Sequence, residues 1–171
     1  MRLTDYFIKK RVCALAALAA GRRHASRPLD DARRVLVLYE AADAARVEPC
    51  LARLREGGQA VETCVYVTGG PEPDSSCLAV HAKRDVSLWQ FPSDALLERF
   101  KAVEADILID LTRPGCYPML YLMLQHPCGF KVGAKQEGID LYDLSISLTV
   151  REDIGRLFEH ILFYLRAIRS K

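Results

Sequence analysis

Two short runs of apolar residues constrain the fold of this chain more than any other feature. Residues 34–39 and residues 106–111 are rich in Val, Ile and Leu, and apolar side chains stand at consecutive rather than alternate positions. Consecutive apolar positions are typical of strands buried on both faces, as in a parallel sheet covered by helices. We therefore expect both segments to be central strands of a parallel sheet.

Helical and strand patterns alternate along the rest of the chain. Residues 43–56 have helical spacing of apolar side chains and residues 60–67 read as a strand, so the stretch 34–67 is a β–α–β unit. The other expected elements are strands at 77–81, 86–91, 129–133 and 144–150, and helices at 93–103, 117–125 and 152–169. This alternation predicts an α/β fold with an open, mostly parallel, Rossmann-like sheet that has helices on both faces.

The length of 171 residues fits one domain. We expect residues 1–28 to form a basic amphipathic helix and a linker, and residues 29–171 to form the Rossmann-like domain, which ends in a long helix. The first helix should span residues 4–23, with Thr4 or Asp5 as N-cap and its end at Gly21. A signal peptide is the alternative for this segment. No other stretch has the length and hydropathy of a transmembrane helix, so we expect a cytoplasmic protein.

Positive charge is concentrated at the start of the chain. Residues 1–34 hold nine Lys and Arg and three acids, whereas the remainder holds 15 basic and 19 acidic residues. Such a basic arm contacts RNA, the ribosome, an anionic membrane or an acidic protein, or is only a solvated helix face. If the arm serves docking alone, deletion of residues 1–23 should spare the fold. The candidate contact residues are Lys9, Lys10, Arg11, Arg22 and Arg23.

Polar residues follow the strand at 106–111. Ligands of open parallel sheets bind at the carboxyl ends of the strands, which is where Asp110, Thr112 and Arg113 are expected. Arg113 can hold a phosphate or carboxylate, and the alternative for Asp110 is that it accepts backbone N–H groups and fixes the loop. Lys131 and Asp143 are candidates for the same crevice. These five residues are a candidate site for a small anionic ligand.

Several common cofactor and metal sites are disfavoured. The loop at 39–43 has two carboxylates and no glycine, and no P-loop motif occurs, so no nucleotide cofactor is expected. The six cysteines form no CxxC pair and the histidines are scattered, so no metal site is expected. Cys116, at the start of a helix where a thiol pKa can fall, is the best candidate nucleophile.

Two resemblances add to this interpretation. The segments that carry the first are Leu3–Lys10, Ala105–Thr112, Phe130–Gly133 and Leu157–Leu165. With them, nearly the whole chain resembles an uncharacterised bacterial family of short α/β proteins, a resemblance that implies no activity. Asp106–Leu111 followed by Lys131–Gly133 is similar to the N-terminal half of heptosyltransferase-type glycosyltransferases. Those enzymes hold their nucleotide-sugar donor in a second domain, so this likeness implies the fold and not glycosyl transfer.

The sequence favours a non-catalytic or regulatory domain that binds a small anion at the strand ends. One alternative is an interaction protein that docks on RNA, the ribosome or an anionic membrane through its first helix. The other is a small enzyme that uses Asp110, Lys131 and Asp143, which requires these side chains to converge within hydrogen-bond reach.

Overall fold

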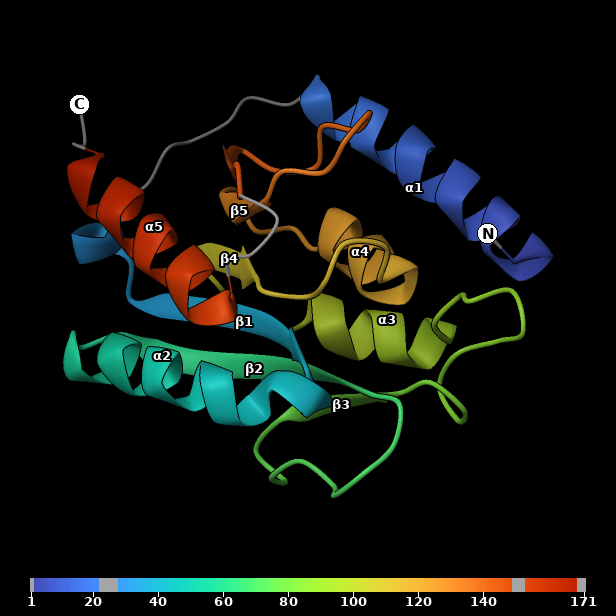
Figure 1. The fold of residues 1–171 in the computed structure, drawn as a ribbon, viewed down its shortest axis with the longest axis horizontal. Coiled ribbons are helices and arrows are strands. Elements are labelled where there is room, and N and C mark those ends of the chain that lie inside the picture. Colours follow the sequence, from blue (N-terminus) through green and yellow to red (C-terminus); the bar gives the residue numbers. More distant parts are fainter. Residues whose placement is uncertain (1, 22–27, 149–152, 169–171) are drawn as a thin grey trace.

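The computed structural model describes residues 2–21, 28–148 and 153–168. Its centre is a six-stranded sheet in the order β3-β2-β1-β4-β5-β6, in which all neighbouring strands are parallel (Figure 1). The strands are β1 (Arg34–Glu40), β2 (Ala60–Val67), β3 (Leu78–His81), β4 (Ile107–Asp110), β5 (Lys131–Ala134) and β6 (Leu144–Ile146). The helices are α1 (Leu3–Ala20), α2 (Ala44–Glu56), α3 (Asp94–Lys101), α4 (Tyr117–Gln125) and α5 (Ile154–Ala167). The predicted open α/β fold is confirmed.

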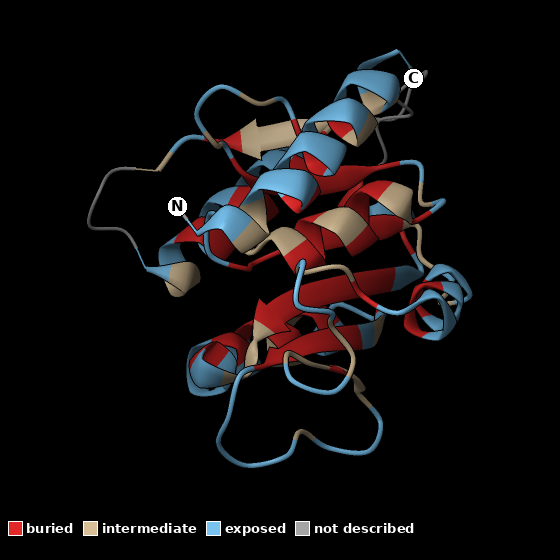
Figure 2. Cartoon of the chain, turned by 90° about the vertical axis from the view of Figure 1, so that its right-hand side faces the viewer, coloured by how far each residue is buried: buried red, intermediate tan, exposed pale blue. Residues whose placement is uncertain are grey.

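Helices cover both faces of the sheet. Helices α2 and α5 pack on one face, and α1, α3 and α4 lie on the other, so that the sheet separates two hydrophobic cores. Successive residues of β1 enter opposite cores: Val35 and Val37 face α2 and α5, whereas Leu36 and Leu38 face α3 and α4. Figure 2 shows the strands as the most continuous buried region. Burial on both sides explains why β1 is apolar at consecutive positions.

The strand order reverses direction between β1 and β4. From β1 the chain proceeds through α2 to β2 on one side, and from β4 it proceeds through α4 to β5 on the other. The loops that follow β1 and β4 therefore diverge to opposite faces of the sheet. This is the topological switch point at which open α/β sheets place ligands.

Two crossovers contain no helix. Residues 68–77 connect β2 to β3 and residues 135–143 connect β5 to β6 as loops. On β6, Leu144 and Ile146 contact the core under α5, while Ser145 lines a hollow on the opposite face. The sheet edge at β6 is thus covered by a helix on one face and hollowed on the other.

Helix α1 packs on the body against α4 (Figure 1). Its buried side chains are Ile8, Val12 and Ala16, which belong to the same core as α4. Lys9, Lys10 and Arg11 are exposed, as a contact surface requires. Arg22 and Arg23 lie outside the described residues. Because Ile8 and Val12 are fully buried, these contacts argue against the expectation that deleting residues 1–23 spares the fold.

The N-terminal boundary of α1 differs from the prediction. The helix begins at Leu3 with Arg2 as its N-cap, so the assignment of Thr4 or Asp5 to this position was wrong. Gly21 is the C-cap residue, as predicted. Among the described residues, none of the helices combines the length and the hydropathy that crossing a bilayer requires.

Two strand predictions also need correction. Residues 86–91 form no strand; a single antiparallel bridge joins Val86 to Pro92, and the segment between them is a turn. The Ser87 hydroxyl accepts the backbone N–H groups of Trp89 and Phe91, so the segment bonds to itself rather than to a neighbouring strand. The last strand ends at Ile146 instead of residue 150, and residues 149–150 lie outside the described residues.

Truncation of the buried face of α1 tests whether this helix is part of the folded unit. We expect Ile8→Ala to lower the free energy of unfolding by about 2–5 kcal/mol, because it leaves a cavity between α1 and the body. Leu18→Ala, on the exposed face of the same helix, should change it by less than about 0.5 kcal/mol. Urea denaturation measures both. Equal effects would contradict the packing of α1 described here.

Candidate functional site

A buried carboxylate organises the loops that leave the switch point. Asp43, in the short 3₁₀ helix Ala41–Asp43 after β1, is fully buried. Arg113, after β4, donates to it from Nε at 3.2 Å and from Nη2 at 2.8 Å. Arg46 donates from Nη1 to the same carboxylate at 3.1 Å. Two guanidinium groups, one from the first turn of α2 and one from the loop after β4, are therefore fixed on one carboxylate, and Asp43 raises the pKa of Arg113.

Glu40 completes this group of charges. Its carboxylate accepts the backbone N–H of Arg113 at 3.1 Å and lies 3.7 Å from Nε of the same residue. Burial raises the pKa of Glu40, and the contacts with Arg113 oppose that shift. The two carboxylates of segment 39–43, which in the sequence only disfavoured a nucleotide cofactor, are thus the anchors of Arg113.

A pocket of about 240 Å³ lies next to this cluster. Asp43, Arg46, Thr112 and Arg113 contribute its polar lining together with Asp153, the N-cap residue of α5. Its apolar lining consists of Leu111, Pro114, Ala134, Leu148, Ile154 and Leu157. The pocket therefore offers an apolar interior with guanidinium groups beside it, at the strand ends where a ligand was expected.

Asp110 is sealed beneath this region rather than open to it. Its Oδ1 accepts the Thr112 backbone N–H at 2.9 Å and the Thr112 hydroxyl at 2.6 Å, while its Oδ2 accepts the Tyr142 hydroxyl at 2.7 Å. Only 1% of the residue is exposed. This is the arrangement that the sequence analysis gave as the alternative, a carboxylate that fixes the loop. Burial raises the pKa of Asp110, partly opposed by the hydrogen bonds from Thr112 and Tyr142.

Tyr142 reaches Asp110 only because β5 has a glycine beside it. Gly133 pairs with Asp110 across β4 and β5. A Cβ atom built on Gly133 would lie 2.4 Å from Cζ of Tyr142, so the ring lies directly against the glycine backbone. Burial and the neighbouring Asp110 carboxylate raise the pKa of Tyr142 well above its usual value. The tyrosine is therefore a neutral hydrogen-bond donor at physiological pH.

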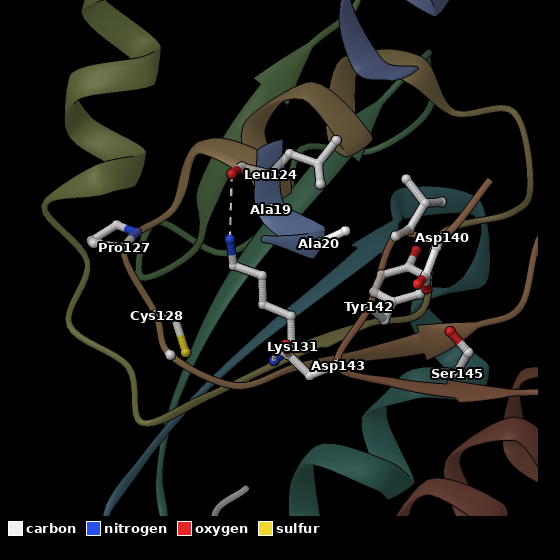
Figure 3. A pocket seen from close by; sticks show the side chains of 12 residues that line it. Ala19, Ala20, Leu124, Pro127, Cys128, Lys131, Asp140, Tyr142, Asp143 and Ser145 are labelled. Atoms are coloured by element: carbon white, nitrogen blue, oxygen red, sulfur yellow. Dashed lines mark hydrogen bonds between the residues drawn. The ribbon is translucent and has the colours of Figure 1, made fainter. Parts of the chain in front are cut away.

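Lys131 and Asp143 belong to a second, larger pocket of about 560 Å³ (Figure 3). The buried Lys131 side chain extends along this pocket, and its Nζ donates to the carbonyl oxygen of Leu124, 3.4 Å away near the end of α4. A cation is stabilised at that position because helix carbonyls point toward it. Asp143 accepts the backbone N–H of Lys131 at 2.7 Å.

The five predicted ligand residues therefore divide between two places. Thr112 and Arg113 line the smaller pocket, and Lys131 and Asp143 line the larger one. Asp110 lies between them and uses its carboxylate oxygens on Thr112 and Tyr142. Lys131 and Asp143 thus share the larger pocket, whereas Asp110 does not belong to its lining.

Sequence reasoning also missed Arg46 and Tyr142, beside the acidic anchors described above. Arg46 had a usable signal, since it stands three residues after Asp43 at the start of a helix, where such side chains meet. Tyr142 had none, because position 142 reaches Asp110 only through the order of strands β4, β5 and β6 in the sheet.

Cys116 does not have the character of an activated nucleophile. It is the N-cap residue of α4, as the sequence suggested, but burial raises the pKa of its thiol, with Glu40 and Asp110 acting in the same direction. The expected lowering of this pKa was wrong because burial outweighs the helix terminus. In the described part of the chain, no three His, Cys, Asp or Glu side chains gather so that they could hold a metal ion.

The contact of Tyr142 with Gly133 predicts that alanine destabilises the protein at position 133 but not at position 129. Gly133→Ala should lower the free energy of unfolding by about 1–3 kcal/mol, because the new methyl group displaces the Tyr142 ring from Asp110. Gly129→Ala is the matched control, since a Cβ atom there meets nothing within 4 Å. It should change stability by less than about 0.5 kcal/mol. Guanidinium denaturation of the natural chain and the two variants measures these free energies. Equal stability of all three would refute the close contact between Tyr142 and Gly133.

The raised pKa of Asp110 predicts a pH-dependent difference from Asp110→Asn. The folded state binds the Asp110 proton more tightly than the unfolded state, so this residue stabilises below its unfolded pKa of about 3.9 and loses that contribution as pH rises through the folded pKa. The asparagine keeps an acceptor for Thr112 and does not titrate. The unfolding free energy of the natural chain, minus that of the variant, should therefore fall as the pH rises above about 4, by at most about 1.4 kcal/mol per pH unit. A constant difference in urea melts would show that the pKa is not raised.

Comparison with known proteins identifies a family for this chain but no curated relative. The model of a family of unknown function, DUF6913, matches residues 5–168, a span that includes both pockets, the switch point and all but the first two residues of helix α1. The chain is therefore a member of the DUF6913 family, whose function is unknown.

Proposed function

We propose that this protein is a non-catalytic, ligand-binding or regulatory α/β domain of the bacterial cytoplasm that holds a small anion in the 240 Å³ pocket at the switch point. The observation that carries this proposal is the fixation of Arg46 and Arg113 on one fully buried carboxylate, that of Asp43. A guanidinium group held in place before the ligand arrives loses less side-chain entropy on binding.

The two arginines retain donors for a ligand. A guanidinium group has five N–H donors, of which Asp43 engages two from Arg113 and one from Arg46. Both side chains are 61% exposed, so their remaining N–H groups are accessible. Planar donor pairs of this kind suit a carboxylate or phosphate group.

The remainder of the pocket favours a ligand that also has an apolar part. Side chains from β5, from the start of α5 and from the loop after β4 form its apolar walls. The described residues of the loop after β1 contain no glycine-rich turn to approach a pyrophosphate, so a dinucleotide is not the proposed ligand. A small amphipathic acid or phosphate ester fits these features.

The enzyme alternative has less support. Asp110 accepts hydrogen bonds from Thr112 and Tyr142 and does not belong to the lining of the larger pocket, which holds Lys131 and Asp143. The likeness to heptosyltransferase-type enzymes contributes the fold only, because their glycine-containing acceptor loop is replaced by one with Glu40 and Asp43.

A thermal-shift screen with alkyl and aryl carboxylates, sugar phosphates and nucleotides tests the proposal. A ligand at one hundred times its Kd adds about 2.7 kcal/mol, which raises the Tm by a few degrees. Arg46→Gln should raise the Kd of the ligand by about tenfold or more, since a hydrogen bond to a charged group is lost. Arg55→Gln, an exposed change on the same helix, should not. Equal Kd values in the two variants, or no stabilising ligand, would overturn the proposed site.

A further inference from the structure

The exposed face of α1 is unusually apolar at its N-terminal end. Leu3 is 80% exposed, and Tyr6 and Phe7 are each about half exposed. The turn at residues 86–92 presents Leu88 (85% exposed) and Trp89 (46% exposed). Figure 1 shows the start of α1 and the loop between β3 and α3 on the same side of the molecule. These five residues, here named the aromatic corner, lie apart from both pockets.

The aromatic corner is held together by ring contacts. The Phe7 and Trp89 rings meet edge to face with their centroids 5.2 Å apart, and Tyr6 contacts Phe7 in the same manner at 5.5 Å. Ser87 closes the turn beneath Trp89 through its hydroxyl. Two segments some eighty residues apart in the sequence therefore present one preformed apolar surface.

Basic side chains flank the α1 part of this surface. Arg2, Lys9, Lys10 and Arg11 are exposed on the same helix. Lys10 stands one helical turn after Tyr6, so it projects on the same face. Asp5 is the one acid among residues 1–29, and it is half-buried. The corner thus combines leucine and aromatic side chains with a positive rim.

We propose that the aromatic corner binds the surface of an anionic lipid bilayer. Leu, Trp, Tyr and Phe side chains partition into the interfacial region, and Lys and Arg beside them attract anionic headgroups. The two leucines are the most exposed members of the corner, at 80% and 85%, and aliphatic side chains favour a lipid interface over the base stacking that single-stranded RNA requires. This inference does not depend on the ligand proposed for the switch-point pocket.

Trp89 reports directly on the proposed contact because it is the only tryptophan of the chain. We expect vesicles that contain phosphatidylglycerol to shift its emission to shorter wavelength and to protect it from acrylamide. Pure phosphatidylcholine vesicles should give a weaker effect, and added salt should weaken binding to the anionic vesicles. Vesicle co-sedimentation measures the affinity independently of the fluorescence.

Paired variants separate the aromatic corner from general surface effects. Leu3→Ser with Leu88→Ser should reduce binding about tenfold or more, because both side chains are almost fully exposed and their loss spares the core. Phe163→Ser, an exposed aromatic on α5, is the apolar control and should bind normally. Lys10→Glu should weaken binding about fivefold or more, whereas Lys135→Glu, an exposed lysine remote in sequence, should not.

Several results would overturn the proposal. They are an unchanged Trp89 spectrum with anionic vesicles, equal loss of binding in the test and control variants, and salt-sensitive binding to short RNA in place of vesicles. A blue shift that appears without lipid as protein concentration rises, together with a dimer mass, would assign the corner to a second copy of the chain. Each of these leaves the ligand site at the switch point unaffected.

Discussion

The need to bury β1 and β4 on both faces underlies the rest of this structure. A parallel strand with apolar side chains on both faces must lie between two layers of helices, so the chain after each central strand has to leave the sheet. It leaves toward α2 after β1 and toward α4 after β4, which opens the switch point between them. The position of the smaller pocket follows from this divergence and needs no glycine-rich motif to create it.

The Asp110 carboxylate connects the two pockets, which lie on opposite faces of the sheet. Through Oδ1 it fixes Thr112, which lines the smaller pocket, and through Oδ2 it fixes Tyr142, which lines the larger one. A carboxylate at this depth is tolerated because three donors surround it. One side chain therefore joins the loop after β4 to the loop between β5 and β6.

The fold was more predictable than the site, for a physical reason. Consecutive apolar residues in β1, and the alternation of strand and helix patterns, depend on local chain geometry that a sequence records directly. The turn at 86–91 was misread as a strand because its apolar residues have two different roles: Val86 and Phe91 pack against the core, whereas Leu88 and Trp89 are exposed. The candidate site depended on which side of a sheet each side chain occupies. Lys131 begins strand β5 and Arg113 follows strand β4, yet the two side chains line different pockets.

The same limit applies to Tyr142 and Gly133. The glycine reads in sequence as the end of a strand, whereas its structural role is to leave room for a ring that belongs to another loop. A single sequence cannot show that these two positions meet, because their contact arises from the order of strands β4, β5 and β6.

The packing of α1 on α4 has a consequence during synthesis. Residues 3–20 leave the ribosome about 100 residues before α4 is complete, which at 5–20 residues per second is an interval of about 5–20 s. During that time the side that will cover α4 and the side that carries Tyr6 and Phe7 are both open to solvent. The nascent helix is therefore a hydrophobic segment that chaperones and lipid surfaces can reach before the domain exists.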